Sequence, residues 1–492
     1  MGKQPLTFLS HLVLSHLVLS QIKQEKKQKN EKDNMMKLKK QFGLILFSGL
    51  ILPLCFAPFG LWWLLPLTLV PLLYVIENTK PKHAIYLGIL EGTIGYGLCL
   101  HWLFFIFGTA AIPLFVILAT FIGFFAFIFN VVSKPIKHDI LKVALAAMIW
   151  TALEFYRSEI FFLRFPWLSI GSAVEPTILL PMIGVYGVSF VVIFSCVAMI
   201  YKKTRVIGYV LFICIALLVK FNHKPIQHDK EGIRTTVVQY DGYTIEEYIK
   251  ITETLTADDT ELIVWPESAL IYDVRKFYKD FIVLTNFCKG MDATMVVGTK
   301  TVNGMNDTDW YNTALTIDSN GYIIGEYYKM RPVHLMNDGT PGTRLPIVSS
   351  PLGNFGTPIC FDCDYTSIVR KLVNNGAEYF AVPFLDAAYW SKYQHYQHAQ
   401  IFRLRAAENA RWFACAGASG ISQFIDPYGN VISSLPPMET GVLTETIYKS
   451  NKITFFTRYG WLFPWLNLFG MIIVFVWSAG VIIQRIVSTK KD

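Results

Sequence analysis

The chain has 492 residues, of which 53% are hydrophobic and only 16% are charged, and its formal net charge is +8. This balance excludes a purely soluble protein, so part of the chain is expected to lie in lipid. The positive charge does not indicate nucleic-acid binding, because the Lys and Arg residues lie at the ends of apolar segments rather than in one basic stripe. We interpret these residues as determinants of membrane topology.

The first 34 residues contain the tandem repeat "HLVLSHLVLS" and then a polar run that is too charged to bury a core. Met35 and Met36 follow, and the next residues, "KLKK", are typical of the start of a first membrane helix. We therefore expect residues 1–36 to be an N-terminal extension. It is either a disordered tail or a gene-model artefact with translation starting at Met35 or Met36, and it is left out of the predicted fold.

Apolar spans in residues 37–221 predict a membrane domain with seven transmembrane helices. The uncharged stretch 42–76 would reach about 52 Å as one helix, beyond a hydrocarbon core of roughly 30 Å, so it is expected to fold back once, at residues 57–60. A last apolar span lies in residues 460–492, predicted as a C-terminal transmembrane helix and cytoplasmic tail. The other five expected spans are 84–107, 110–133, 141–156, 178–201 and 206–220.

Basic residues fall in every second loop of this eight-span count. Because cytoplasmic loops carry the excess of Lys and Arg, both termini are predicted in the cytoplasm and residues 222–459 on the far side of the membrane. The loop 157–177 lies on that far side too. Its "FPW" segment, Phe165 to Trp167, is expected either to line a lateral entrance near the membrane surface or to anchor the chain at the interface.

Residues 222–459 alternate short β-branched runs with helical periodicity, which predicts a layered α/β domain. A helix is expected within 395–413, and polar residues close three expected strands at Glu267, Cys360 and Asp386. The expected strands are "RTTVVQY" (234–240), "ELIVWPES" (261–268), "ATMVVGTK" (293–300), "NTALTID" (312–318), "GTPICFD" (356–362) and "EYFAVPFLD" (378–386).

The residues at these strand ends suggest a cysteine acyl-transfer site. A thiol becomes a strong nucleophile only as thiolate, so Cys360 needs a base or a cation beside it. Glu267 has the carboxylate that accepts the thiol proton, and Lys329, which follows a strand of its own, has the ammonium that stabilises a developing oxyanion. These three residues are the predicted catalytic group.

Four segments resemble the successive motifs of the nitrilase superfamily, whose Glu-Lys-Cys triad would fall on Glu267, Lys329 and Cys360. These segments are "VWPESAL", "YYKMRP", "GTPICFD" and "RLRAAENARWFACAGASGISQFIDPYGNV". The membrane segments "CFAPFGLWWLLPL", "GYGLCLHWLFF", "TALEFYRS", "FPWLSIGSA" and "PMIGVYGVSFVV" resemble those of apolipoprotein N-acyltransferases. The resemblance covers nearly everything from Met36 to the C-terminus. It implies a polytopic α-helical membrane domain plus an extracytoplasmic α/β nitrilase-like domain, an α-β-β-α sandwich.

The resemblance also implies a reaction at the outer face of the cytoplasmic (inner) membrane. Cys360 would attack an ester of a phospholipid, form a thioester and release a lysophospholipid. The α-amine of the lipidated N-terminal cysteine of an apolipoprotein would then take the acyl chain. The implied partners are a phospholipid donor and a lipidated acceptor, with no nucleic acid, no metal and no cofactor, and we expect a monomer.

Three positions near the predicted triad depart from the family pattern. Phe361 and Asp362 stand where the family usually has Tyr and Glu. The supporting acid expected after the lysine falls on Asn337, with Asp338 next to it. Either Asp338 takes over after a one-residue slip, or the supporting acid is absent.

Further candidates have simpler alternatives. Trp167, Asp386 and Trp390 are expected to bind substrate, although Asp386 is as readily a helix N-cap. His395 and His398 lie three residues apart on the expected helix, which is a spacing that metal sites use. Since no carboxylate or Cys stands at ligand spacing, we predict no metal site there.

Other functions remain open from the sequence. Cys360 and Cys363 form a Cys-x-x-Cys pair, which would suit a periplasmic thiol-disulfide oxidoreductase, but this leaves Glu267 and Lys329 unexplained. An acyltransferase or amidase of the same fold with a different acceptor is another alternative. A non-enzymatic scaffold with a decayed site is the third, against which the retained Glu-Lys-Cys set argues, while Asn337 argues mildly for it.

Overall fold

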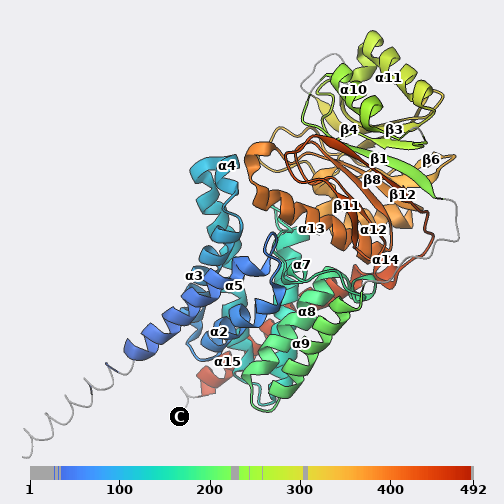
Figure 1. The fold of residues 1–492 in the computed structure, drawn as a ribbon. Helices are drawn as coiled ribbons and strands as arrows, with labels where there is room; N and C mark the ends of the chain where they lie inside the picture. Colours follow the sequence, from blue (N-terminus) through green and yellow to red (C-terminus); the bar gives the residue numbers. More distant parts are fainter. Residues whose placement is uncertain are drawn as a thin grey trace, which may run out of the picture.

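The computed structural model describes residues 35–222, 232–242, 244–257, 259–302 and 309–488, together with Lys27 and Lys32. The predicted extension 1–36 lies almost wholly outside the described residues. Figure 1 shows a bundle of helices with a β-rich body packed on one end of it. The bundle comes from the apolar N-terminal part and the last helix, and the β-rich body comes from the segment between them.

A helix lies in each of the eight predicted apolar spans. The first helix is Met35–Cys55, and the chain turns back at residues 57–60 as expected. The predicted span 84–107 contains two helices, α3 (Pro81–Cys99) and the short α4 (Leu103–Phe107). The remaining spans contain α2 (Leu65–Glu77), α5 (Ala111–Ser133), α6 (Asp139–Phe155), α8 (Leu180–Ile200), α9 (Arg205–Lys220) and α15 (Leu462–Ser488).

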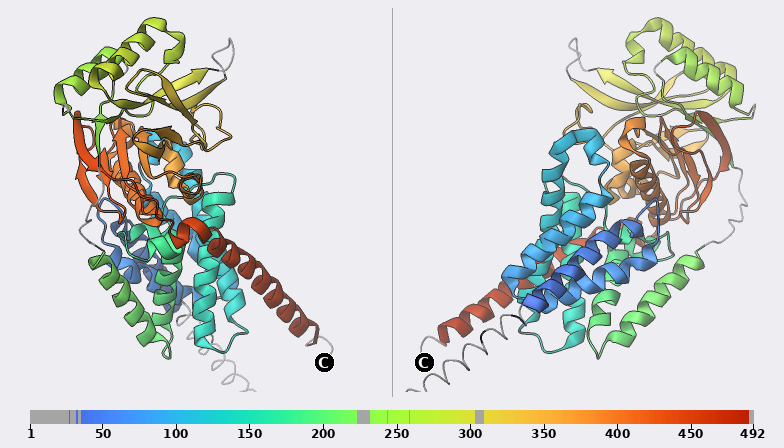
Figure 2. Two further views of the ribbon diagram at one scale, coloured as in Figure 1. Left: turned by 90° about the vertical axis from the view of Figure 1, so that its right-hand side faces the viewer. Right: turned by 60° about the vertical axis from the view of Figure 1, so that its left-hand side comes forward.

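Four helical segments in the described part are long and apolar enough to cross a membrane: Met35–Cys55, Leu103–Ser133, Leu180–Ile200 and Leu462–Val481. The count of seven crossings plus one therefore stays a prediction. The start of the first helix and the end of α15 lie at the end of the bundle away from the β-rich body (Figures 1 and 2). This arrangement agrees with termini on one side of a membrane and the β-rich body on the other.

Small residues allow α3 and α5 to pack closely. A Cβ on Gly92 would lie 2.9 Å from the Cα of Ala119, and a Cβ on Gly123 would lie 2.6 Å from Ile89 Cγ1. Close approach of helices through Gly and Ala is the usual packing mode in membranes, where burying apolar surface between helices adds little. The pair forms the part of the bundle from which α4 rises toward the β-rich body (Figure 1).

The β-rich body contains two six-stranded sheets. The first has the order β12-β1-β2-β3-β4-β5 and the second the order β11-β10-β9-β8-β7-β6. The first sheet comprises β1 (Ile233–Gln239), β2 (Leu262–Val264), β3 (Thr294–Val302), β4 (Trp310–Ile317), β5 (Ile323–Tyr328) and β12 (Gly441–Ile447). The second comprises β6 (Val348–Ser350), β7 (Gly353–Gly356), β8 (Tyr379–Phe384), β9 (Phe413–Gly417), β10 (Gln423–Ile425) and β11 (Val431–Ser434).

Helices cover the outer face of each sheet. The amphipathic helices α10 (Ile245–Leu255) and α11 (Tyr278–Met291) bury their apolar sides on the first sheet, and α12 (Thr366–Asn374) and α13 (Lys392–Asn409) cover the second. One apolar cluster contains residues of both sheets, among them Val264 of β2 and Val382 of β8. This is the predicted α-β-β-α sandwich, and its α13 side rests on the helical bundle (Figure 2).

The expectation that Cys360 closes a strand is wrong. Strand β7 ends at Gly356, and Cys360 begins a short 3₁₀ turn, Cys360–Asp364, with φ of +50°. Pro358 lacks the N–H that a continuing ladder requires. The Asp362 carboxylate then accepts a hydrogen bond from the Ile359 N–H, which closes the turn. Glu267 and Asp386 likewise lie a few residues beyond β2 and β8.

Candidate active site

Glu267 and Lys329 form a buried ion pair between the sheets. The Lys329 Nζ lies 2.7 Å from Glu267 Oε1, and both side chains are almost fully buried. Cys360 is joined to this pair through the backbone of Leu385. Its thiol donates to the Leu385 carbonyl, with the sulfur 3.7 Å from the oxygen, while the Leu385 N–H donates to Glu267 Oε2 at 2.8 Å. The three predicted catalytic residues therefore meet in one buried site.

A second carboxylate, Asp338, completes the surroundings of the lysine. Its Oδ2 lies 2.7 Å from Lys329 Nζ and accepts the Val333 N–H at 2.8 Å. The Asn312 amide donates to Glu267 Oε1 and to Asp338 Oδ1, at 2.7 Å each, and so fixes both carboxylates. Asn337 is exposed, so the geometry favours the one-residue slip to Asp338.

The electrostatics of the site keep the cysteine a thiol until substrate arrives. Burial alone would lower the pKa of Lys329, but the carboxylates of Glu267 and Asp338 outweigh it and raise that pKa well above its usual value. Burial and the negative charge of Glu267 raise the pKa of the Cys360 thiol, against the opposing effect of Lys329. A base must therefore remove the thiol proton as the nucleophile attacks.

Asp362 links the cysteine turn to the loop after the lysine. It accepts hydrogen bonds from the Arg331 N–H and the Tyr327 hydroxyl, at 2.8 Å each, and from the Met330 N–H at 3.2 Å. Burial raises the pKa of Asp362 to about 6, although Lys329 and these hydrogen bonds act to lower it. Although Asp362 is one methylene shorter than the Glu usual in the family, it still reaches the backbone N–H groups after Lys329 and so helps to hold the lysine beside Cys360.

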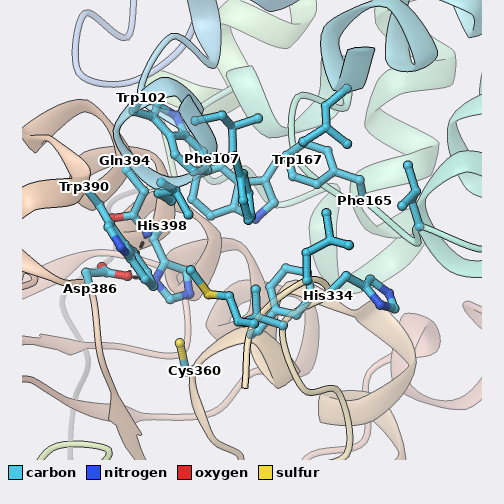
Figure 3. Close-up of a pocket in the computed structure, with 18 of the residues that line it drawn as sticks. Trp102, Phe107, Phe165, Trp167, His334, Cys360, Asp386, Trp390, Gln394 and His398 are labelled. Atoms are coloured by element: carbon cyan, nitrogen blue, oxygen red, sulfur yellow. Dashed lines mark hydrogen bonds and ion pairs between the residues drawn. The ribbon is translucent and has the colours of Figure 1, made fainter. Parts of the chain in front are cut away.

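An apolar pocket opens at Cys360 (Figure 3). The helical bundle and the loop before α7 (Ile170–Ala173) provide one wall, which includes Trp102, Phe107, Phe165 and Trp167. The sandwich provides the other wall, which includes the predicted residues Phe361, Asp386 and Trp390. The site is therefore built by both parts of the chain, and the "FPW" segment contributes to it through Phe165 and Trp167.

The polar end of this pocket lies along α13. Asp386 Oδ1 accepts hydrogen bonds from Gln394 Nε2 at 2.7 Å and from His398 Nδ1 at 2.8 Å. The side-chain cap of α13 is Ser391, so the alternative of Asp386 as a helix N-cap is wrong. His398 Nε2 lies 3.3 Å from Asp364 Oδ1, and Asp364 in turn accepts from the indole of Trp167.

Asn312, Asp364 and Gln394 also belong to the site but were not predicted from the sequence, and His398 was considered only as a metal ligand. Asn312 gave no signal, since it lies within an ordinary β-strand. The spacing of Gln394 and His398, four residues apart, did contain a signal for one polar face of α13. The meeting of that face with Asp364 depends on tertiary packing.

Gly298 on β3 holds the Glu267 loop in place, and we predict that Gly298→Ala impairs catalysis. A Cβ at this position would lie 2.2 Å from the Pro266 carbonyl oxygen and 2.6 Å from Glu267 Cα. Since both are backbone atoms, the loop has to shift, and a shift of about 1 Å costs about 10²-fold in rate. The rate of acylation of Cys360 by labelled phospholipid measures the effect.

The matched control is Gly290→Ala on α11, where a Cβ meets no atom within 4 Å. This variant should acylate at the wild-type rate and unfold at an equal or higher temperature, because Ala favours helix. A wild-type rate in Gly298→Ala would contradict the importance of the Glu267 position.

Comparison with known proteins agrees with this architecture. Residues 48–198 match the family described as apolipoprotein N-acyltransferase N-terminal domain, and residues 234–451 match the carbon-nitrogen hydrolase family. The apolipoprotein N-acyltransferase of Geobacter metallireducens is 22% identical over 89% of this chain and 95% of its own. That of Wigglesworthia glossinidia brevipalpis is 24% identical over 84% of this chain and 93% of its own. The crystal structure of Saccharomyces cerevisiae Nit3, a member of branch 10 of the nitrilase superfamily, aligns with a TM-score of 0.39 at 19% identity, over 44% of this chain and 90% of that protein.

The fold and the site define an acyltransferase of the nitrilase type, built on a bundle of apolar helices. Both parts of the chain match in the order and over the length of one family. The chain thus resembles the apolipoprotein N-acyltransferases over nearly its whole length, as its motifs predicted.

Proposed function

We propose that this protein transfers an acyl chain from a phospholipid, through a thioester on Cys360, to the N-terminal α-amine of a diacylglyceryl-cysteine lipoprotein. The observation that supports this most is the position of Cys360. It lies at the junction of the buried Glu267–Lys329 pair and an apolar pocket whose other wall is formed by the helical bundle. A hydrolase acting on small soluble amides has no use for such a wall, whereas a long acyl chain needs one.

Each residue of the triad has one task in the first half-reaction. Glu267 accepts the thiol proton as the sulfur attacks the ester carbonyl carbon, and it returns that proton to the leaving glyceryl oxygen. Lys329 stabilises the negative charge that develops on the carbonyl oxygen. Asp338 and Asp362 hold the lysine and its loop in position. The products are the Cys360 thioester and a lysophospholipid.

The pocket walls suggest how the donor is bound. Trp167 and Phe165 lie on the opposite side of the pocket from Trp390 (Figure 3), and Phe361 of the sandwich also lines it. An acyl chain between these rings would be removed from water, at about 0.8 kcal/mol for each buried CH₂ group. Trp167 is also fixed through its hydrogen bond to Asp364, so it is positioned before the substrate binds. Trp167 and Trp390 are the proposed binding residues for the donor chain. Asp386, the third proposed substrate-binding residue, lies at the polar end of the pocket, away from the rings that would hold this chain.

We place the protein in the inner membrane of a bacterium, as a monomer, with the sandwich on the periplasmic side. The loops rich in Lys and Arg lie at the end of the bundle away from the sandwich, as the positive-inside rule requires of a cytoplasmic face.

We predict that topology reporters fused at the start of the sandwich and at the C-terminus of the chain give opposite signals. A reporter fused at Asn222, next to the sandwich, should be active only as a periplasmic fusion, and one fused at Asp492 only as a cytoplasmic fusion. Cysteine accessibility at the same two positions, measured on intact cells, is the independent check of the reporter signals. Like signals from both fusions would contradict this topology.

The structure offers little to the alternative of a thiol-disulfide oxidoreductase. Cys360 and Cys363 are both free thiols, and Cys363 is fully buried in the core of the sandwich, so no partner thiol reaches it. Burial raises the pKa of Cys363 well above its usual value, which is the opposite of what a redox-active thiolate needs.

The test of the proposed function is N-acylation by the purified protein. The enzyme in detergent, given a phospholipid and a diacylated lipopeptide with a free α-amine, should produce a triacylated lipopeptide whose mass is higher by one acyl chain. A lipopeptide with a blocked amine is the control. No product, with the thioester still formed on Cys360, would mean that a different acceptor is used.

A further inference from the structure

We propose that Asp386, positioned by His398 and Gln394, is the binding site for the ammonium group of the acceptor and the base that deprotonates it in the second half-reaction. This inference rests on the proposed function. It assigns the recognition of the acceptor to residues outside the triad.

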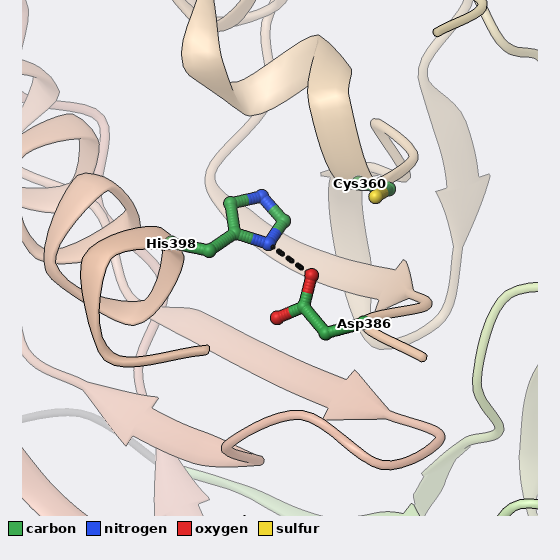
Figure 4. A group of neighbouring side chains, drawn as sticks. All are labelled: Cys360, Asp386 and His398. Carbon is green, nitrogen blue, oxygen red and sulfur yellow. Dashed lines mark hydrogen bonds and ion pairs between the residues drawn. The ribbon is translucent and has the colours of Figure 1, made fainter. Parts of the chain in front are cut away.

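The first argument is proximity to the nucleophile. Cys360, Asp386 and His398 each contribute one side-chain atom to a buried group whose members lie within 4.8 Å of one another (Figure 4). An amine that attacks the thioester carbonyl must come within about 3–3.5 Å of that carbon. Since the carbon is bonded to the Cys360 sulfur, a nitrogen that attacks from the Asp386 side comes within hydrogen-bond reach of this carboxylate.

The second argument is the set of polar atoms left without partners at this end of the pocket. Asp386 Oδ2, Gln394 Oε1 and Trp390 Nε1 are buried and make no hydrogen bond with the described residues. The side chains of Asp386 and Gln394 are 1% and 3% exposed, and both line the pocket. Buried polar groups are rarely left unsatisfied. Two of these three atoms are acceptors, which suit a ligand that donates several hydrogen bonds.

Gly420 leaves room beside this carboxylate. A Cβ at residue 420 would lie 2.8 Å from Asp386 Oδ2 and 3.1 Å from its Cβ, so any side chain there would crowd the unpartnered oxygen. Its φ is not in the left-handed region, so the backbone does not require glycine. The glycine therefore preserves the close packing of the Phe384 ring as well as the space beside Asp386 Oδ2.

The charge of the cluster selects a cation. His398 lies between two carboxylates, with Nδ1 2.8 Å from Asp386 Oδ1 and Nε2 3.3 Å from Asp364 Oδ1. Burial would lower the pKa of His398, but the two carboxylates raise it to about 10, so the imidazole is charged at neutral pH. Two carboxylates and one imidazolium leave one net negative charge. A phosphate group would be repelled here, and an ammonium group would be attracted.

The second half-reaction then balances as follows. The ammonium group of the acceptor loses one proton to Asp386, which passes it to solvent, and the free amine forms a C–N bond to the thioester carbonyl carbon. The C–S bond breaks with its electron pair to Cys360, and the nitrogen loses a second proton, which Glu267 transfers to the sulfur. The products are an amide, a thiol and one released proton.

The test separates the two half-reactions in single turnover. Wild type, Asp386→Asn and His398→Gln are acylated with labelled phospholipid and then treated with a diacylated lipopeptide, with a simple primary amine, or with hydroxylamine, which is uncharged at neutral pH. Asp386→Asn should acylate within about threefold of wild type and discharge to hydroxylamine equally well. Its transfer to either amine should be slower by about 10²-fold, within the range for loss of a general base. His398→Gln should show the same pattern with a smaller loss.

The matched control is His395→Gln, a buried histidine on the same helix whose side chain does not line the pocket. Its Nε2 bonds the Ala387 carbonyl, and the glutamine amide can keep this hydrogen bond. It should leave both half-reactions unchanged. A phospholipid headgroup can also carry an ammonium group. If that group occupies the site instead, Asp386→Asn will slow acylation by phosphatidylethanolamine but not by phosphatidylglycerol, which would overturn the proposal.

Equal losses in both half-reactions, an equal loss with hydroxylamine, or no loss at all would also overturn it. Failure of the proposed function looks different. In that case the wild-type protein would form the thioester and transfer the acyl group to the simple amine, and this transfer would depend on Asp386. It would not transfer the acyl group to the lipopeptide. The amine-binding site would then be correct, and the natural acceptor would be a different amine.

Discussion

Cys360→Ala will take up no acyl label from phospholipid and will form no N-acylated product, because the sulfur that forms the thioester is gone. The change removes only the sulfur atom, and the turn is held by hydrogen bonds of Asp362 and the backbone, so the fold should persist. Labelled phospholipid, followed by peptide mapping of the bound acyl group, measures this directly, and hydroxylamine should release the label from wild type.

Cys363→Ala is the matched control for this experiment. Cys363 lies three residues on and is fully buried in the sandwich core, away from the pocket. It should retain the label at the wild-type level, with a small loss of stability from the change in the core. Label retained in Cys360→Ala, or lost in Cys363→Ala alone, would show that the nucleophile is assigned to the wrong residue.

The second large effect is expected at Asp338. The amide of Asp338→Asn keeps the shape of the side chain but removes one of the two carboxylates that contact Lys329 Nζ. We expect acyl transfer to fall by about 10²-fold, in the range for losing one positioned acid, base or charge partner. Initial rates with saturating phospholipid, compared with the wild-type rate, measure the loss.

Asn337 provides the control for Asp338. Its side chain is exposed, so Asn337→Ala should be nearly silent, and Asn337→Glu should not raise the rate because the site beside Lys329 is already filled. A mild effect of Asp338→Asn together with a faster Asn337→Glu would show that the supporting acid is absent from this chain.

The fold could be predicted from the sequence to the level of layers. Alternating β-branched runs identified the strands of the sandwich, and long uncharged runs identified the helices of the bundle, because both signals arise from local periodicity. The strand boundary before Cys360 was misplaced. There, Pro358 and the side chain of Asp362 produce a turn in place of a continuing strand. Side-chain hydrogen bonds of this kind do not appear in the hydrophobic periodicity of a sequence, so the pattern could not predict the turn.

The site could be predicted only in part, for a related reason. Glu267, Lys329 and Cys360 are recognisable because each follows an apolar strand or lead-in and has a reactive side chain. Asn312 lies within β4 and donates hydrogen bonds to both Glu267 and Asp338. These partners come close to Asn312 only after the strands of the sheet have paired, so the local sequence around Asn312 does not indicate them. The contact between Trp167 and Asp364 joins residues 197 positions apart, which no local pattern contains.

The central claim is tested most directly by isolating the acyl-enzyme and following its acyl group. Wild type is loaded with labelled phospholipid, freed of donor, and mixed with a diacylated lipopeptide. The account predicts that label leaves Cys360 and appears as an amide on the lipopeptide α-amine at matching rates. Label that stays on Cys360, or that is released only as free fatty acid, would contradict it.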